Sequence, residues 1–279
     1  MFEIKVVDLK SKDAEKNFYE SFKNTGFAVI KNHSLKEKTL DNMYQKWGDF
    51  FYSSNKHEYT FTEKSQDGFF PFRSENAKDS DIKDLKEFFH VYPKTKLPEN
   101  VSLVTKEIYK DLVNLGSILL KWIENQTPKE IKSKFSESLI RMIETSENNL
   151  LRILHYPPLE KDVEKGAIRA AAHEDINLIT LLVAGSQPGL EAQDNRGNWH
   201  KVPVDKGMIT VNVGDMLQMA SNGFYPSTSH RVVNPDMDSN VSRFSMPMFL
   251  HPRKDVYLKE NVTADDYLQE RLKEIRLVK

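Results

Sequence analysis

Apolar residues recur at spacings of three and four through much of the first half of the chain. This period is typical of amphipathic helices, which we predict over residues 13–23, 35–52, 102–124 and 136–145. Residues 25–32 are rich in β-branched and aromatic side chains and predict a strand at the edge of the core. Residues 65–84 are polar and have no clean period, so we interpret them as a loop over a cavity.

After Leu150 the pattern changes to short apolar segments separated by turn residues. One of the separators, Asp194-Asn195-Arg196-Gly197, is a strong hairpin turn. Eight short strands favour a jelly roll, a rolled double sheet whose mouth can admit ligands. We therefore predict a mainly β protein with flanking helices, built on a double-stranded β-helix (jelly roll, cupin-like) core with a helical N-terminal region. The predicted strands are residues 151–156, 178–184, 190–193, 199–202, 208–213, 216–220, 229–233 and 243–249.

The chain of 279 residues suffices for one large domain or for a core with an N-terminal subdomain. We divide it into three parts. Residues 1–145 form the helical N-terminal region with the edge strand and the loop that covers the substrate. Residues 146–252 form the jelly-roll core. Residues 253–279 hold a C-terminal helix, over 264–276, that packs on the body.

Composition narrows the class of partner. Forty Lys and Arg residues against 41 Asp and Glu give a formal net charge of -1, so nothing global attracts nucleic acid or an acidic membrane. The chain has no cysteine, its start lacks the apolar core of a secretory signal, and no run approaches membrane-spanning length. We expect a cytoplasmic protein that acts on small molecules. The sequence does not predict its oligomeric state.

Three residues are candidate ligands of a metal ion. In an extended segment, side chains two apart point to one face, so His173 and Asp175 converge while Glu174 turns away. His230 lies far enough along the chain for strands and turns to bring it back to the same point. Two imidazoles and one carboxylate are the facial set that holds non-haem Fe(II) and leaves positions open for small molecules and oxygen.

A second pair of residues is a candidate anion site. Arg243 and Ser245 are also two apart and share one face of a predicted strand. A guanidinium beside a hydroxyl suits a carboxylate, and a basic residue on the inward face of an apolar strand needs an anion to justify its burial. We interpret the pair as the site for the distal carboxylate of a diacid co-substrate.

These motifs occur within a wider resemblance. The chain resembles the isopenicillin N synthase-like branch of the Fe(II)/2-oxoglutarate-dependent oxygenases over nearly its whole length. The segments that carry the resemblance outside the metal motif are Val6-Val7-Asp8-Leu9, Gly26-Phe27-Ala28-Val29-Ile30-Lys31-Asn32-His33, Asp84-Leu85-Lys86-Glu87-Phe88-Phe89 and Leu151-Arg152-Ile153-Leu154-His155-Tyr156-Pro157-Pro158. Leu154 and His155 depart from the Asn and Tyr of many plant members, so no plant-type substrate is implied.

The resemblance implies a function and a set of roles. His173, Asp175 and His230 would hold Fe(II), Arg243 and Ser245 would bind the C5 carboxylate of 2-oxoglutarate, and Tyr156 would hydrogen-bond the same end. The family's chemistry implies a dioxygenase that consumes O2 and 2-oxoglutarate, releases succinate and CO2, and oxidises an unactivated C–H bond of a small molecule. Hydroxylation is the default outcome, although desaturation or ring closure needs only a different placement of the substrate.

The substrate contacts are less specific in the sequence. The aromatic residues Phe70 and Phe72, in the predicted loop, either line the substrate pocket or fix the loop to the core. Arg253 is a candidate for a substrate carboxylate or else a solvated arginine. We interpret the histidines outside the metal motif as surface or core residues: His33, His57, His90, His155, His200 and His251.

Three other functions fit the same residues. An oxidase like isopenicillin N synthase would use the Arg243 and Ser245 pair for its substrate and would need no 2-oxoglutarate. A non-catalytic sensor would bind the metal or the diacid without turnover. A protein hydroxylase would act on a peptide, although no repeat or binding groove indicates one. Turnover of 2-oxoglutarate to succinate separates the first two from the predicted enzyme.

Overall fold

The computed structural model describes residues 2–62, 66–75, 82–160, 164 and 166–274. Its strands form a large sheet, a smaller sheet and a short hairpin, β13 (Tyr257–Lys259) with β14 (Val262–Thr263). The large sheet has the strand order β1-β2-β10-β7-β12-β5-β4-β3. In chain order its members are β1 (Val6–Asp8), β2 (Phe27–Lys31), β3 (Gly68–Phe70), β4 (Glu87–Val91), β5 (Leu150–Tyr156), β7 (Ile179–Val183), β10 (Ile209–Val213) and β12 (Arg243–Leu250).

The smaller sheet completes the roll. Its order is β6 (Ala170–His173), β11 (His230–Val232), β8 (Leu190–Gln193) and β9 (Trp199–Lys201). The turn between β8 and β9 is the predicted hairpin, in which the Asp194 carboxylate accepts backbone N–H groups of Arg196 and Asn198. The predicted fold class, a jelly-roll core with flanking helices, is confirmed.

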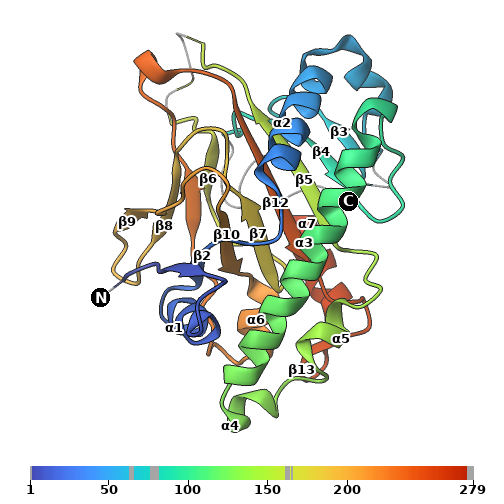
Figure 1. Ribbon diagram of the computed structural model, residues 1–279. Helices are drawn as coiled ribbons and strands as arrows, with labels where there is room; N and C mark the ends of the chain where they lie inside the picture. The colour runs from blue at the N-terminus through green and yellow to red at the C-terminus, as the bar shows by residue number, and fades with distance from the viewer. Residues whose placement is uncertain (1, 63–65, 76–81, 161–163, 165, 275–279) are drawn as a thin grey trace.

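Helices cover one face of the large sheet. The long helix α3 (Glu99–Gln126) runs across it, flanked by α1 (Ala14–Thr25) and α2 (Glu37–Tyr52) (Figure 1). The Trp47 indole donates to the Thr105 hydroxyl and so fixes α2 against α3. The shorter helical elements are η1 (Ser54–Tyr59), α4 (Lys129–Lys132), α5 (Leu139–Ile143), α6 (Asp215–Ala220), η2 (Met237–Ser239) and α7 (Ala264–Glu274).

Strict alternation along the large sheet separates two environments. On β7, Ile179, Leu181 and Val183 join the core beneath the helices, while Thr180 and Leu182 face the space between the sheets. The same alternation separates the two faces of the other central strands. The residues that face the space between the sheets include Arg152, Leu154 and Tyr156 on β5, Asn212 on β10, and Ser245, Pro247 and Phe249 on β12. One face of each strand therefore stabilises the fold, and the other is free to carry chemistry.

Gly26 brings the chain before β11 close to the end of α1. It has φ 69° and closes α1 through a bond from its N–H to the Phe22 carbonyl. A Cβ at this position would lie 2.4 Å from both the Pro226 carbonyl oxygen and the Thr228 hydroxyl oxygen. That hydroxyl donates to the Thr25 carbonyl, so the segment that leads to His230 is held against this corner.

Several predicted elements need correction. Residues 216–220 form helix α6 and no strand, because the chain leaves the sheet at Gly214 and buries Met216, Leu217 and Ala220 at helical spacing. The strand predicted at the edge of the core, β2, lies inside the sheet, because β1 pairs with it on its outer side. Part of the predicted loop is strand β3, and β4 was not predicted. The helix expected over 136–145 shortens to α5.

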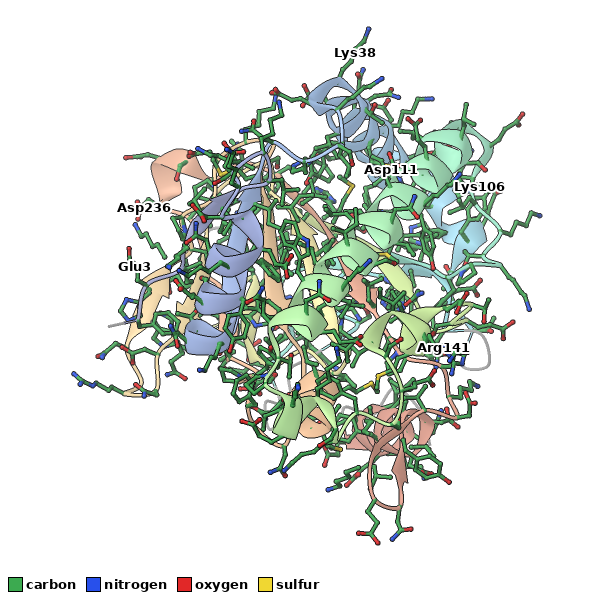
Figure 2. All side chains as sticks on the ribbon, turned by 60° about the horizontal axis from the view of Figure 1, so that its bottom comes forward. Glu3, Lys38, Lys106, Asp111, Arg141 and Asp236 are labelled. Atoms are coloured by element: carbon green, nitrogen blue, oxygen red, sulfur yellow. The ribbon has the colours of Figure 1, made fainter. Side chains whose placement is uncertain are left out.

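The other predicted helices and strands are found with small shifts of their ends. The end of the last predicted helix, at residue 276, and residues 63–65 and 76–81 beside β3 lie outside the described residues. The three-part division of the chain stays a prediction. Charges of both signs lie at the periphery, as Glu3, Lys38, Lys106 and Asp236 do (Figure 2). Within the described ranges, no helix combines the length and the apolar character needed to cross a membrane.

The Gly26 corner predicts a difference between two glycine substitutions. Gly223 also has a positive φ, 80°, but nothing lies within 4 Å of a Cβ built there. We expect Gly223→Ala to lower the free energy of unfolding by about 1–2 kcal/mol for the backbone alone. Gly26→Ala should lower the free energy of unfolding by the same amount and by about 1–3 kcal/mol more, because of the steric overlap. Urea denaturation of both variants measures the difference, and equal losses would contradict the close approach.

Candidate metal centre and cavities

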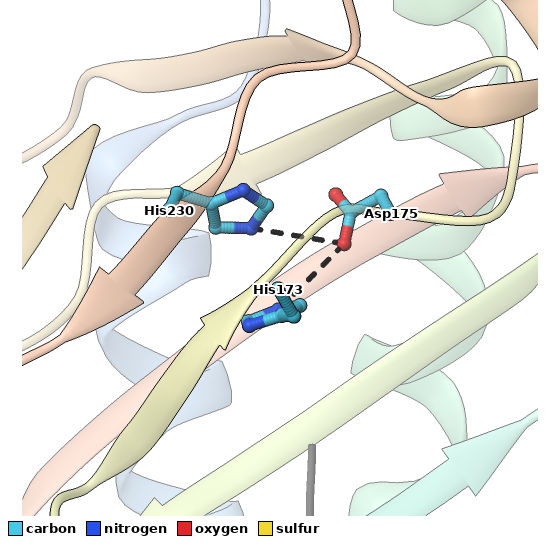
Figure 3. A group of neighbouring side chains, drawn as sticks. All are labelled: His173, Asp175 and His230. Atoms are coloured by element: carbon cyan, nitrogen blue, oxygen red, sulfur yellow. Dashed lines mark ion pairs between the residues drawn. The ribbon is translucent and has the colours of Figure 1, made fainter. Parts of the chain in front are cut away.

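His173, Asp175 and His230 lie together although they come from separate segments. His173 ends β6, Asp175 follows it, and His230 begins β11 directly opposite His173. Nε2 of His173 lies 3.9 Å and Nε2 of His230 lies 3.7 Å from Oδ1 of Asp175 (Figure 3). The three ligand atoms lie within 4.8 Å of one another, and within the described ranges no other group of this kind is found.

Backbone carbonyls fix the orientation of both imidazoles. Nδ1 of His173 is 2.7 Å from the Ala171 carbonyl oxygen, and Nδ1 of His230 is 3.2 Å from that of Thr228. A carbonyl only accepts, so each Nδ1 carries a proton, and in the neutral form of each ring Nε2 keeps its lone pair for a metal. Burial, followed by the neighbouring His230, lowers the pKa of His173 to about 4, so the ring is neutral at physiological pH.

Hydrogen bonds also orient the carboxylate. Oδ2 of Asp175 accepts from the Thr180 hydroxyl at 2.5 Å and from the Asn212 amide at 2.7 Å, which leaves Oδ1 for a metal. Burial raises the pKa of Asp175, but the two imidazoles and these hydrogen bonds outweigh it and hold the pKa below its ordinary value. The three donors are thus a carboxylate and two imidazoles, the set that suits Fe(II).

A cavity of about 370 Å³, called here the open cavity, adjoins the triad. His173 and Asp175 form part of its wall, and four buried or half-buried charged residues form another part: Glu75, Asp84, Lys86 and Arg152. The Lys86 ammonium lies 2.7 Å from a carboxylate oxygen of Glu75 and 2.7 Å from one of Asp84. The Arg152 guanidinium donates to both oxygens of Glu75.

This charged network is connected to the metal ligands. Asp84 accepts the backbone N–H of Ala171, whose carbonyl holds His173. Burial lowers the pKa of Lys86, but Glu75 and Asp84 raise it above its ordinary value. Burial raises the pKa of Glu75, but Arg152 and Lys86 hold it well below its ordinary range. The network contains two basic and two acidic side chains, so its formal charges balance.

Two further cavities lie near the triad. The inner cavity, about 60 Å³, is lined by the triad, Tyr156 and Ser245. The outer cavity, about 730 Å³, is lined by Arg243, and it shares the wall residues Leu182 and Leu190 with the inner one. The predicted co-substrate residues Tyr156, Ser245 and Arg243 thus line the inner or the outer cavity and do not line the open cavity, although the inner and open cavities share Lys86 and Arg152.

Arg243 is buried and only partly hydrogen-bonded. Its Nε donates to the Gln187 carbonyl at 2.9 Å, and its Cζ lies 5.1 Å from the centre of the Tyr156 ring. Its Nη1 has no hydrogen-bond partner within the described part of the chain. A Cβ at position 185 would lie 2.7 Å from Nη2, so Gly185 makes room for the guanidinium.

The predicted substrate residues lie apart from the open cavity. Phe70 is fully buried between Phe61 and Phe88, whereas Phe72 is 43% exposed. Arg253 pairs with Glu137 and donates to the Arg141 carbonyl. None of Phe70, Phe72 and Arg253 is among the described residues that line the cavity, so their positions give the predicted substrate contact no support.

Sequence reasoning missed residues that do line the open cavity. Arg152 is a lone cation on the apolar strand β5, the same signal that identified Arg243. The sequence predicts His90 and His251 to be ordinary core or surface residues, yet both line the cavity. Burial lowers the pKa of each, to about 4 for His251, so both are neutral there. Nothing local in the sequence distinguishes these two from the other histidines.

A jelly roll that carries two histidines and an aspartate beside an open cavity defines a non-haem iron enzyme. Comparison with known proteins identifies the family. Residues 147–252 match the family model of the 2OG-Fe(II) oxygenase superfamily, and residues 4–110 match the N-terminal model described for the non-haem dioxygenase in morphine synthesis. The chain belongs to the Fe(II)- and 2-oxoglutarate-dependent oxygenases of the isopenicillin N synthase-like superfamily.

Full-length relatives agree with this assignment. The chain is 46% identical to a proposed oxygenase from Shewanella oneidensis, whose crystal structure gives a TM-score of 0.89 and covers 99% of this chain and 100% of that one. A proposed 2OG-Fe(II) oxygenase family protein from Caulobacter crescentus is 30% identical, with a TM-score of 0.79 and coverage of 98% and 99%. Clavatol oxidase from Penicillium crustosum is 28% identical over 85% of this chain and 79% of that protein.

The protein is therefore a non-haem Fe(II) oxygenase that uses 2-oxoglutarate and O2. Its family does not fix the substrate.

The Asp175 hydrogen bonds predict a specific loss of metal affinity. Thr180→Val removes the hydroxyl donor to Oδ2, and we expect the Kd for Fe(II), or for Mn(II) as a stable substitute, to rise about 10-fold or more. Thr210→Val is the matched control, because the Thr210 hydroxyl is buried in the same sheet without a hydrogen-bond partner among the described residues. Anaerobic calorimetry measures both. If the two variants bind metal equally well, the carboxylate needs no such support.

Proposed function

We propose that the enzyme hydroxylates an unactivated C–H bond of a small polar molecule bound in the open cavity. One O2 and one 2-oxoglutarate are consumed, one oxygen atom enters the product, and succinate and CO2 leave. The observation that carries the proposal is that His173 and Asp175 line both the open cavity and the inner cavity. Substrate and co-substrate can then reach one metal ion from different cavities.

Each group of side chains has a separate role in this proposal. The ligands His173, Asp175 and His230 hold Fe(II), which supplies the oxidising chemistry when bound. Arg243 pairs with the distal carboxylate of 2-oxoglutarate. Tyr156 and Ser245 line the path between the metal and that arginine. These side chains bind and orient the co-substrate and exclude water from its chain.

The open cavity favours a small, polar substrate. Lys86 and Arg152 keep N–H groups beyond those that bind Glu75 and Asp84, and both residues line the cavity. Phe249 and Leu150 add apolar wall. A substrate with hydrogen-bond acceptors and an apolar part matches these groups. The volume of about 370 Å³ suits a metabolite-sized molecule better than a folded protein.

Co-substrate binding gives the first test of these roles. Anaerobic protein with Fe(II) and 2-oxoglutarate should develop the visible metal-to-ligand charge-transfer band of a chelated 2-oxo acid. Arg243→Gln removes a charge-assisted hydrogen bond, and we expect the Kd for 2-oxoglutarate to rise about 10- to 100-fold. Arg253→Gln is the control, because Arg253 pairs with Glu137 away from the cavities. A wild-type protein without the band would overturn the role of 2-oxoglutarate.

Product analysis tests the proposed outcome of the reaction. With a panel of small polar metabolites, O2 and 2-oxoglutarate, we expect succinate to form in step with a product that has gained one oxygen atom. Isotopically labelled O2 should place the label in that product. A product that has only lost two hydrogens would indicate desaturation or ring closure. Turnover of a peptide alone would favour a protein substrate.

A further inference from the structure

A second buried arginine lies beside the proposed co-substrate site. Arg169 precedes β6 and is only 1% exposed. Its Nη2 donates to the Val241 carbonyl at 2.7 Å, whereas its Nε has no hydrogen-bond partner within the described part of the chain. Sequence reasoning did not identify this residue. A buried guanidinium with an unused N–H group requires an explanation.

Arg169 and Arg243 share one environment. Both line the outer cavity, and the Tyr156 ring lies near both, with its centre 6.0 Å from Cζ of Arg169 and 5.1 Å from Cζ of Arg243. Each guanidinium has one buried nitrogen without a partner in the described residues, Nε in Arg169 and Nη1 in Arg243. Two cations therefore present unused hydrogen-bond donors in the same region.

The described residues supply no counter-charge to this pair. Among the described residues, neither arginine forms an ion pair. Of the five carboxylates on the cavity wall, Glu37, Asp41 and Glu191 pair with Lys206 or Arg231, and Asp205 and Asp236 pair with neither arginine. Burial, and then the nearby Arg243, lowers the pKa of Arg169 to about 10. The residue still carries its charge at physiological pH. Two adjacent buried cations without an anion are unfavourable, so the site favours an anionic ligand.

We propose that Arg169 is a second binding residue for the distal carboxylate of 2-oxoglutarate, so that two guanidiniums and not one select a dicarboxylate co-substrate. This inference rests on the proposed function, because it needs 2-oxoglutarate to extend from the metal toward Arg243. The 2-oxo acid end chelates the metal in any such acid. The arginine pair would therefore act only on acids that carry a second carboxylate.

The test compares two acids that differ only at the distal end. 2-Oxopentanoate has the carbon chain and the chelating end of 2-oxoglutarate but a methyl group in place of the distal carboxylate. Both can be titrated anaerobically into the Fe(II) protein by the charge-transfer band. For Arg169→Gln we expect the Kd for 2-oxoglutarate to rise about 10- to 100-fold, the loss of a charge-assisted hydrogen bond. The Kd for 2-oxopentanoate should change less than about 2-fold.

Three further variants complete the experiment. Arg169→Lys keeps the charge, and its Kd for 2-oxoglutarate should lie between those of wild type and Arg169→Gln. Lys206→Gln removes an exposed cation at the rim of the outer cavity and should leave both affinities unchanged. In the double variant with Arg243→Gln, the loss should be smaller than the product of the single losses, because both residues contact one carboxylate.

The outcomes separate a binding role from a structural one. If Arg169 only supports the fold, Arg169→Gln will lower the unfolding temperature. It will then weaken the binding of both acids equally, or the binding of neither, and either result overturns the inference. If Arg169→Gln does not fold, the same comparison of the two acids on Arg169→Lys decides. Should wild-type protein not bind 2-oxoglutarate, the proposed function fails. If wild-type protein binds 2-oxoglutarate and the Arg169 variants bind it equally well, only the inference about Arg169 is refuted.

Discussion

The two-residue period of the large sheet is the constraint on which the rest of the structure depends. Each central strand must bury an apolar face beneath α1, α2 and α3, which fixes its register with its neighbours. The same register also determines which side chains lie on the opposite face, toward the space between the sheets. Thr180, Asn212 and Ser245 all reach the same interior because a slip of one residue would move apolar side chains into it. Packing energy under the helices thus specifies the geometry of the site.

The metal ligands themselves come from the smaller sheet and its loop, so a second set of contacts must join the two layers. The Asp175 carboxylate accepts hydrogen bonds from Thr180 of β7 and Asn212 of β10, both strands of the large sheet. On the other side, the Thr228 hydroxyl bonds to Thr25 at the Gly26 corner, and the Thr228 carbonyl orients His230. The triad is therefore held between two layers whose stability does not depend on a metal. Because its ligands are already oriented, metal binding requires little rearrangement of their side chains.

Much of this could be predicted from sequence, and the failures share a cause. Local spacing gives the His173 and Asp175 pair and most strand bounds, and the family resemblance adds His230. Residues 216–220 alternate too weakly to reveal that the chain leaves the sheet at Gly214. Arg152 and Arg169 have the same signal as Arg243, a cation in an apolar segment. Their partners are remote or absent: Glu75 is 77 positions from Arg152, and Arg169 has no carboxylate beside it in the described chain.

The balance of charge differs between two groups of buried cations near the triad. At the open cavity, Lys86 and Arg152 are neutralised by Glu75 and Asp84 within hydrogen-bonding distance. At the outer cavity, Arg169 and Arg243 have no such partners among the described residues. The whole chain is nearly neutral, so this contrast is local and cannot be deduced from net charge. An anion is therefore attracted to this arginine pair, while the charged network at the open cavity offers directed hydrogen bonds without excess charge. This asymmetry favours the proposed orientation of the co-substrate, with its distal carboxylate toward the two arginines, and leaves the open cavity for a substrate of balanced charge.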